Sequence, residues 1–472
     1  MYRLPLVLFL LFLVGCQDRG DVSGKSDHGL IISSLTHPNK IEILTLAKNQ
    51  QFDQLEAYFT NLYQAFNDKN IPEDWLRQAH HAFYNSDPDI QQYLDAWVDQ
   101  SPNSYFAVLN RGIYWMRLAQ LSRGADYINK TQERQKLGMR YYQETALVDL
   151  HKAAELSPKA FLPYSYIMSI SKTSGDNALY ISARSAGLKL FPESFILRSE
   201  ILFGLQPKWG GTKDALDLFI EETTRHSATN PELRSLLGYK ALIAADTMKR
   251  GDRDAAITLY DEAIGFGGNE FMYLSRGKNY YYKRDYKRAI EDFNKALEFY
   301  PQYTYALNYK AWALFHLDEY EKAVSAFKHA IELDRLEPSV NYGLGYILSS
   351  QGRYKEAVYY YDAAVKHYGA YDAKTLSSYG YMLVWKLKNY KRAVEILRRS
   401  TEVDPENAFA WYNYGVALSY LRDCDVISVH KTYLRLCDGA KTCTKKNIEW
   451  AERNSAHLIN GGTCKDQPMF LF

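Results

Sequence analysis

The stretch that decides the fold is EFMYLSRGKNYYYKRDYKRAIEDFNKALEFYP, residues 270–301. It places small and aromatic residues in a fixed order and ends with a proline: Gly277, Tyr280, Ala289, Phe293, Ala296 and Pro301. Small residues let two helices of a hairpin approach closely, aromatic residues fill the gaps between them, and proline ends the second helix. The stretch therefore predicts a hairpin of two closely packed helices.

The same register returns twice at intervals of 34 residues, as Ala311, Leu314, Ala323, Phe327 and Ala330, then as Gly345, Leu348, Ala357, Tyr361 and Ala364. A fourth unit carries Gly380, Ala393, Leu397, Ser400 and Pro405, with one extra residue near Lys388, and a fifth begins at Trp411. This pattern resembles the tetratricopeptide repeat. The resemblance implies an all-α fold, an α/α superhelical solenoid of helical hairpins, with the repeats over residues 231–421.

Upstream of the repeats the periodicity is looser. We expect residues 30–230 to form a divergent helical solenoid that continues into the repeats. Residues 121–142, LSRGADYINKTQERQKLGMRYY, read as an insertion much longer than a normal turn between packed helices. His80 and His81 are adjacent in a helical segment, so their side chains diverge by about 100° and cannot hold one metal ion together.

Two further passages, NSYFAVLNRGIYWMRLAQLSRGADY and LQPKWGGTKDAL, contain two Arg-Gly pairs and a Trp-Gly-Gly motif. They resemble bacterial envelope-associated proteins with a domain of unknown function ahead of tetratricopeptide units. The matching positions are Arg111, Gly112, Arg123, Gly124, Trp209, Gly210 and Gly211. The resemblance implies no activity. One interpretation of the second passage is a structural corner with a buried Trp209 and a helix cap at Thr212; the other is a pocket in which Arg111, Arg123 and Trp209 meet a glycan or an anionic small ligand.

The N-terminus predicts a membrane anchor. Arg3 precedes an apolar run that is too short to span a bilayer, and Leu13-Val14-Gly15-Cys16 resembles the lipobox of bacterial lipoproteins. This implies a signal peptide over 1–15, acylation of Cys16 with palmitate-type chains, and a flexible tether over 16–29. Gln17 in second position implies the outer membrane, facing the periplasm or the cell surface. The alternative is an ordinary secretory signal in which Cys16 is incidental.

Four cysteines lie in the last 49 residues, which we expect to form a C-terminal cap over 422–472. An oxidising compartment favours disulfides over metal, and no CxxC pair is present. If residues 425–437 and 444–459 form antiparallel helices, the nested pairing is Cys437 with Cys443 and Cys424 with Cys464, because Cys424 and Cys437 would lie about 20 Å apart.

In the 34-residue frame of the resembling family, four positions of each first helix face the concave side. Here they carry Phe271, Lys278, Tyr281, Tyr305, Asn308, Trp312, Tyr342, Tyr346, Ser377, Tyr381 and Tyr412. This lining predicts an aromatic groove for an extended peptide, a partner helix or a glycan strand. Some of the tyrosines are expected to pack between helices instead.

Composition and motifs exclude several function classes. The formal net charge is +2, which does not favour nucleic acid. The chain contains no HExxH, GxSxG, GxGxxG or Walker-type motif, so we expect neither an enzyme nor a bound metal or cofactor. The sequence predicts a lipid-anchored scaffold that binds envelope proteins or peptides through its aromatic groove.

Overall fold

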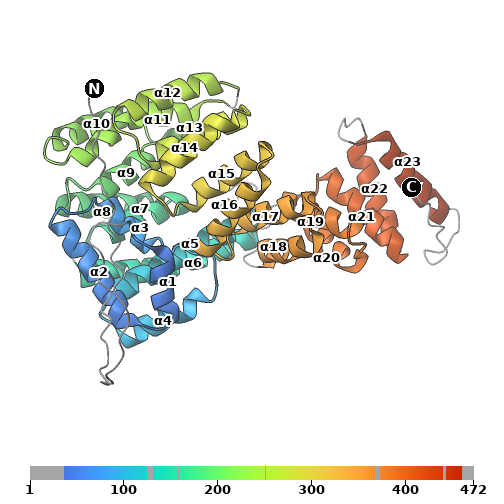
Figure 1. The fold of residues 1–472 in the computed structure, drawn as a ribbon, viewed down its shortest axis with the longest axis horizontal. Coiled ribbons are helices and arrows are strands. Elements are labelled where there is room, and N and C mark those ends of the chain that lie inside the picture. The colour runs from blue at the N-terminus through green and yellow to red at the C-terminus, as the bar shows by residue number, and fades with distance from the viewer. Residues whose placement is uncertain are drawn as a thin grey trace, which may run out of the picture. The chain divides into compact units, whose positions relative to one another are not determined.

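The computed structural model describes residues 37–124, 131–157, 160–249, 251–366, 373–438 and 443–459. In these ranges it contains 23 α-helices, two short 3₁₀ helices and no strand (Figure 1). The predicted fold class, an all-α solenoid of helical hairpins, is confirmed.

The repeat segment forms five consecutive helical hairpins. Their paired helices are α13 (Glu270–Tyr282) and α14 (Tyr286–Phe299), α15 (Thr304–His316) and α16 (Tyr320–Leu333), α17 (Pro338–Ser350) and α18 (Tyr354–Lys366), α19 (Ala373–Trp385) and α20 (Tyr390–Val403), α21 (Ala408–Leu421) and α22 (Val426–Cys437). The small residues of the repeat explain the close pairing. A Cβ atom on Gly277 would lie 2.7 Å from the Phe293 ring, and one on Gly380 would lie 2.4 Å from Leu397.

The turns inside these hairpins repeat with the sequence. In the first three, the middle turn residue has a left-handed backbone, at Arg284 (φ 64°), Asp318 (φ 61°) and Gly352 (φ 77°), each 34 residues after the last. This conformation ends the first helix and reverses the chain. The extra residue predicted near Lys388 lies in the turn between α19 and α20, and Lys388 takes the left-handed conformation there (φ 51°).

The segment before the repeats is also helical. Its first four helices are α1 (Lys40–Lys48), α2 (Phe52–Asn67), α3 (Asp74–His80) and α4 (Ile90–Gln100). They are followed by α5 (Tyr105–Arg123), α6 (Glu133–Leu156), α7 (Leu162–Ser174), α8 (Asn177–Leu190), α9 (Phe195–Gly204), η1 (Pro207–Trp209), α10 (Lys213–His226), η2 (Pro231–Gly238), α11 (Tyr239–Thr247) and α12 (Arg253–Gly265).

The prediction that residues 121–142 form a long insertion between two helices is wrong. Most of it belongs to α5 and α6, which run to 19 and 24 residues, while the helices of the repeats have 12 to 14. Gly138 lies in α6 close to Ser122 of α5: a Cβ there would lie 3.2 Å from that of Ser122. The glycine therefore permits close packing of two long helices.

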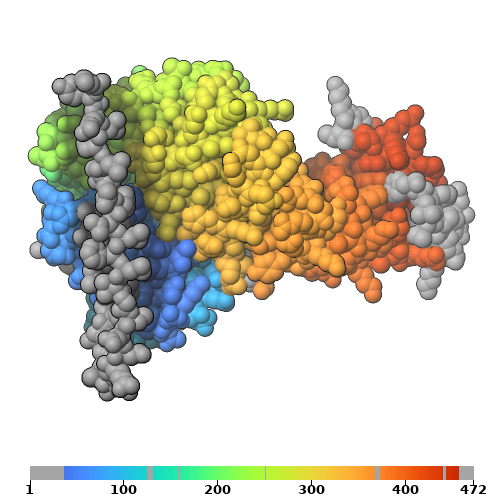
Figure 2. All heavy atoms as spheres, viewed as in Figure 1, coloured from blue at the N-terminus to red at the C-terminus, as the bar shows by residue number. Residues whose placement is uncertain are grey.

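The first helices do not simply extend the solenoid. They pack against turns of the repeats more than 200 residues later, and Figure 2 shows the N-terminal part (blue) directly against the yellow and orange repeats. Gln78 Nε2 donates to the carbonyl of Phe299 (3.0 Å), and Asn85 Nδ2 donates to that of Leu333 (3.1 Å). The backbone N–H of Ser86 donates to the carboxylate of Asp334 (3.0 Å). These contacts enclose one part of the inner face of the repeats.

At the other end, α23 (Lys445–Ile459) packs on α21 and α22, where Trp450 and Ala451 are buried. The predicted disulfide between Cys437 and Cys443 is present at the turn, with Cα atoms 5.6 Å apart. Cys424 is also disulfide-bonded. Its predicted partner Cys464 lies outside the described residues, so that pairing stays a prediction.

The predicted signal peptide, Cys16 and the tether also lie outside the described residues. Within the ranges that the structure describes, no helix has both the length and the apolar character needed to cross a membrane.

Candidate functional site

The residues predicted to line one continuous groove fall into two groups. Phe271, Tyr305 and Asn308 lie at the N-terminal ends of α13 and α15, where they line a cavity between the N-terminal helices and the repeats; Asn308 is buried there, and Tyr305 is 41% exposed. Farther along the inner helices, the predicted residues Tyr281, Trp312, Tyr346 and Tyr381, together with Phe315, which was not predicted, form what we call the aromatic surface. The predicted groove is therefore split into a closed half and an open half.

The aromatic surface is built from ring contacts between successive inner helices. The Trp312 and Tyr346 rings have centroids 5.6 Å apart, and Phe315 meets Tyr346 at 6.0 Å, edge to face. Tyr346 and Tyr381 are 38% and 39% exposed, and Phe409 beside Tyr381 is 49% exposed. These rings are held by their neighbours and still present area to solvent.

Other predicted groove residues have packing roles. Tyr342 and Tyr412 are buried, and Tyr412 contacts the rings of Tyr433 and Trp450 in the C-terminal cap. Ser377 is buried as well. The ammonium of Lys278 lies over the ring of Tyr309, 5.3 Å from its centroid. Tyr342 and Tyr412 stabilise the stacking of hairpins and offer little surface to a partner.

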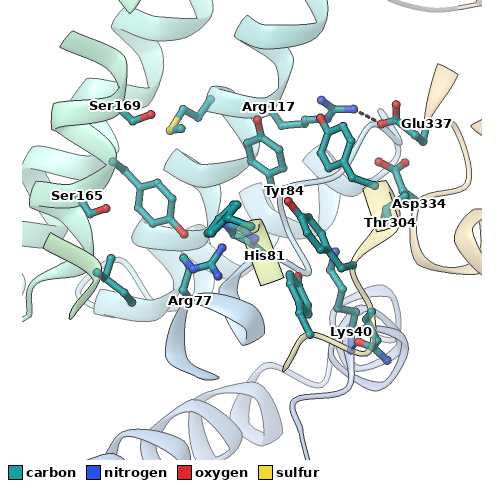
Figure 3. A pocket seen from close by; sticks show the side chains of 18 of the residues that line it. Lys40, Arg77, His81, Tyr84, Arg117, Ser165, Ser169, Thr304, Asp334 and Glu337 are labelled. Carbon is teal, nitrogen blue, oxygen red and sulfur yellow. Dashed lines mark hydrogen bonds and ion pairs between the residues drawn. The ribbon is translucent and has the colours of Figure 1, made fainter. Parts of the chain in front are cut away.

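The cavity of the closed half has a volume of about 260 Å³ and lies between α3, α5, α7 and α9 on one side and α13, α15 and the turn before α17 on the other (Figure 3). Its walls are rich in aromatic rings, among them Tyr84, Tyr166, Phe271, Tyr300, Tyr303 and Tyr305. Figure 3 shows Arg77 and His81 on one wall and Asp334 and Glu337 on the opposite wall.

Charged side chains of the cavity wall hold the two sides together. The guanidinium of Arg117 pairs with the carboxylate of Glu337 and donates to Ser86 Oγ (2.9 Å). Arg77 pairs with Glu270 (2.5 Å) and Asp74 (2.6 Å). Burial raises the pKa of Asp334 to about 7 and lowers that of Lys40 to about 8, because both lose hydration.

Several polar atoms around the cavity have no partner. Within the described part of the chain, Tyr166 Oη and Asn308 Oδ1 are buried and accept or donate no hydrogen bond. Lys40 Nζ makes no hydrogen bond or ion pair there either, and lies 6.0 Å from the centroid of the Tyr300 ring. Buried polar groups are nearly always satisfied by protein, water or a ligand.

The second predicted pocket does not form. Arg111 and Arg123 lie twelve residues apart on α5, about 18 Å along its axis, and line different hollows. Arg111 is committed to the carboxylate of Asp149 (2.8 Å). Trp209 lines neither hollow and is 40% exposed, so the prediction of a buried corner residue is also wrong. The corner itself is as expected, with Gly210 left-handed (φ 85°) and the Thr212 side chain accepting from Ala215 N (3.2 Å).

His80 and His81 point to different surroundings. His80 is buried, stacks on Phe59 and has Nδ1 2.7 Å from Asn110 Oδ1, while His81 lines the cavity. In the described ranges no group of three His, Cys, Asp or Glu side chains is arranged to hold a metal ion.

Sequence reasoning missed most of the cavity wall, including Lys40, Arg77, Tyr166 and Tyr300. The sequence contains only a weak signal for these residues. Some of them are cationic residues, buried in the structure, inside helical segments that lack the repeat signature. Only contacts between distant segments bring these residues together.

Two kinds of known protein family match the chain. A tetratricopeptide-repeat model matches residues 274–338 and 318–373, and a second such model matches 373–407. A model described as a domain of unknown function, DUF4034, matches residues 40–182. The chain contains tetratricopeptide repeats and an N-terminal DUF4034 domain. The cavity is therefore lined by the DUF4034 domain, which supplies Lys40, Arg77, Arg117 and Tyr166, by α9, and by the repeat segment.

Curated relatives match short stretches of the chain. Anaphase-promoting complex subunit 3 of Schizosaccharomyces pombe is 24% identical over 153 residues, 32% of this chain and 23% of that protein. Heat shock protein STI1 of Saccharomyces cerevisiae is 28% identical over 142 residues, 28% of this chain and 22% of that protein. The matches thus span less than a quarter of these relatives.

Among solved structures, yeast Tom70 aligns with a TM-score of 0.37 and 15% identity, covering 89% of this chain and 95% of that structure. YrrB, described as a tetratricopeptide-repeat protein with an unusual peptide-binding site, aligns with a TM-score of 0.33 and 20% identity, covering 41% of this chain and 97% of that structure.

Proposed function

We propose that this DUF4034 protein is a scaffold without catalytic activity, anchored to the outer membrane by acylated Cys16, that binds envelope proteins or peptides through its aromatic surface. The anchored solenoid then faces the periplasm or the cell surface. The family matches support a protein-binding scaffold: tetratricopeptide repeats are found, and one curated relative is by its name a subunit of a larger complex.

The observation that carries the binding site is the row of partly exposed rings on successive inner helices. Tyr and Trp are enriched at protein interfaces because they bury a large area at low cost in side-chain entropy. Tyr346 and Tyr381 are held by ring contacts with Trp312 and Phe409, so little further ordering is needed on binding. Such pre-organised aromatic anchors are typical of interface hot spots.

The binding site is tested by crosslinking in intact envelopes, followed by capture of the protein and mass spectrometry. The double variant Tyr346→Ala/Tyr381→Ala is compared with Tyr359→Ala, which removes a 65% exposed tyrosine from the outer helix α18. We expect the double variant to recover the partner at least about tenfold less efficiently, and the control to recover it as wild type does. Equal recovery from the double variant and wild type would contradict the proposed surface.

The anchor is tested separately with Cys16→Ala. Metabolic labelling with an alkyne analogue of palmitate is expected to mark wild type and not the variant, and density-gradient fractionation is expected to place only wild type in the outer membrane. Equal labelling of both chains would rule out Cys16 as the acylated residue.

A further inference from the structure

The cavity between the DUF4034 domain and the repeats is a separate feature from the aromatic surface. We propose that it is a binding site for one small neutral saccharide, a monosaccharide or a disaccharide unit. The site does not depend on the proposed partner surface, because none of the residues of that surface lines the cavity.

The aromatic walls suit the apolar faces of a sugar ring. Phe271 and Tyr300 line the cavity, but cations of the protein already lie over both rings: the Arg77 guanidinium is 5.3 Å from the Phe271 centroid and 6.0 Å from that of Tyr300. A cationic ligand would be repelled by these resident charges. The area of these rings that the cations leave free is therefore suited to contact with the C–H groups of a sugar.

The polar atoms without a hydrogen-bond partner favour a ligand that carries hydroxyl groups. Lys40 and Tyr300 are 6% and 3% exposed, and among the described residues no hydrogen bond reaches Lys40 Nζ or Tyr300 Oη. Lys40 Nζ can only donate, whereas the unpartnered Asn308 Oδ1 can only accept. A ligand with several hydroxyl groups satisfies both, because each hydroxyl donates and accepts.

The charge of the wall favours a neutral ligand. Three cationic residues line the cavity, Lys40, Arg77 and Arg117, and so do three acidic residues, Glu200, Asp334 and Glu337. Arg117 pairs with Glu337, and Lys172 pairs with Glu200 from behind the wall. A ligand with a net charge would therefore find no excess of the opposite sign.

The size of the cavity limits the ligand. Its volume of about 260 Å³ lies just below the ~300–1,000 Å³ of pockets for drug-sized ligands. A sugar of one or two rings fits this scale.

The test is isothermal titration calorimetry on the full chain, kept in a detergent without a sugar head group. The probes are glucose, N-acetylglucosamine, maltose and N,N′-diacetylchitobiose, with glucuronate and glucosamine as charged analogues. We expect at least one neutral sugar to bind at one site per chain, more tightly than the charged analogues. Lys40→Met and Tyr300→Phe should each weaken its binding about tenfold.

The control is Tyr433→Phe, which removes another buried, unpartnered hydroxyl, far along the chain in α22. It should bind within twofold of wild type. Circular dichroism melting checks that each variant is folded. If Lys40→Met does not fold, Tyr300→Phe still tests the proposal. The proposal is overturned if no probe binds saturably, if a charged analogue binds more tightly than the neutral sugars, or if both cavity variants bind as wild type does.

Discussion

The closed and open halves of the inner face use the same repeats and differ in what covers them. At the N-terminal ends of α13 and α15, the DUF4034 domain lies over the repeats and buries charged pairs such as Arg117 with Glu337. Farther along, the rings of Tyr346 on α17 and Tyr381 on α19 are partly exposed, as is Tyr305 at the mouth of the cavity. A tetratricopeptide frame alone thus does not determine which inner residues meet a partner, because a second domain of the same chain can take part of the face.

The largest expected effect comes from the ion pair that closes the cavity. Glu337→Ala leaves the Arg117 guanidinium, which is 4% exposed, without its carboxylate, and should lower the free energy of unfolding by about 3 kcal/mol. The matched control is Glu356→Ala, which breaks an exposed Arg–Glu pair on α18 and should cost about 0.5 kcal/mol or less. Urea unfolding followed by circular dichroism measures both. Similar losses in the two variants would mean that the ion pair of the closed half contributes no more to stability than an exposed pair does.

A second effect depends on pH. Burial raises the pKa of Glu73 to about 7, even though its carboxylate accepts from Phe195 N and Ile196 N at the start of α9. A raised folded-state pKa gives stability that is present below pH ~4.5, the unfolded value, and is lost as the pH rises through ~7. Glu73→Gln removes this titration, so wild type should lose about 3 kcal/mol relative to the variant between pH 4.5 and 8.

Urea unfolding at a series of pH values gives that difference directly. Glu395→Gln, which makes the same substitution at an exposed glutamate on α20, serves as the control for the substitution itself. A constant difference between wild type and Glu73→Gln would show that Glu73 titrates at its ordinary pKa.

The smallest effect concerns the turns, which both halves share. Gly352→Ala puts a side chain on a left-handed residue (φ 77°) and should cost about 1 kcal/mol. The reverse change at the equivalent turn, Arg284→Gly, should stabilise by less than about 1 kcal/mol, since Arg284 already pays for φ 64°. Thermal melting of both variants measures the pair, and opposite signs are expected.

The sequence predicted what is local and repeated. Gly277, Gly380 and the alanines between them contact partners within about twenty residues, so their spacing reveals the hairpins directly. The Gly-Gly corner with its cap at Thr212 was predicted for the same reason. The exposure of Trp209 was not, because it depends on which neighbours pack around the corner.

The cavity could not be predicted from spacing. Ser86 meets Asp334 across 248 residues, and Arg117 meets Glu337 across 220. No periodicity relates such positions, and Arg117 in a helix without the repeat signature looks like a solvated charge. Arg111 and Arg123 were singled out because each belongs to an Arg-Gly pair. Their spacing on one helix keeps them too far apart to share a pocket.

The contact between Ser86 and Asp334 also has a consequence for how the chain folds. Repeat arrays ordinarily fold by local nucleation and growth, since each hairpin needs only its neighbours. Here the DUF4034 domain cannot complete its packing until a segment about 250 residues later in the chain is in place, so an interval separates the folding of the two segments. During that interval its unpaired cations and aromatic rings remain exposed, and closing this long loop is expected to be the slow, chaperone-sensitive step of folding.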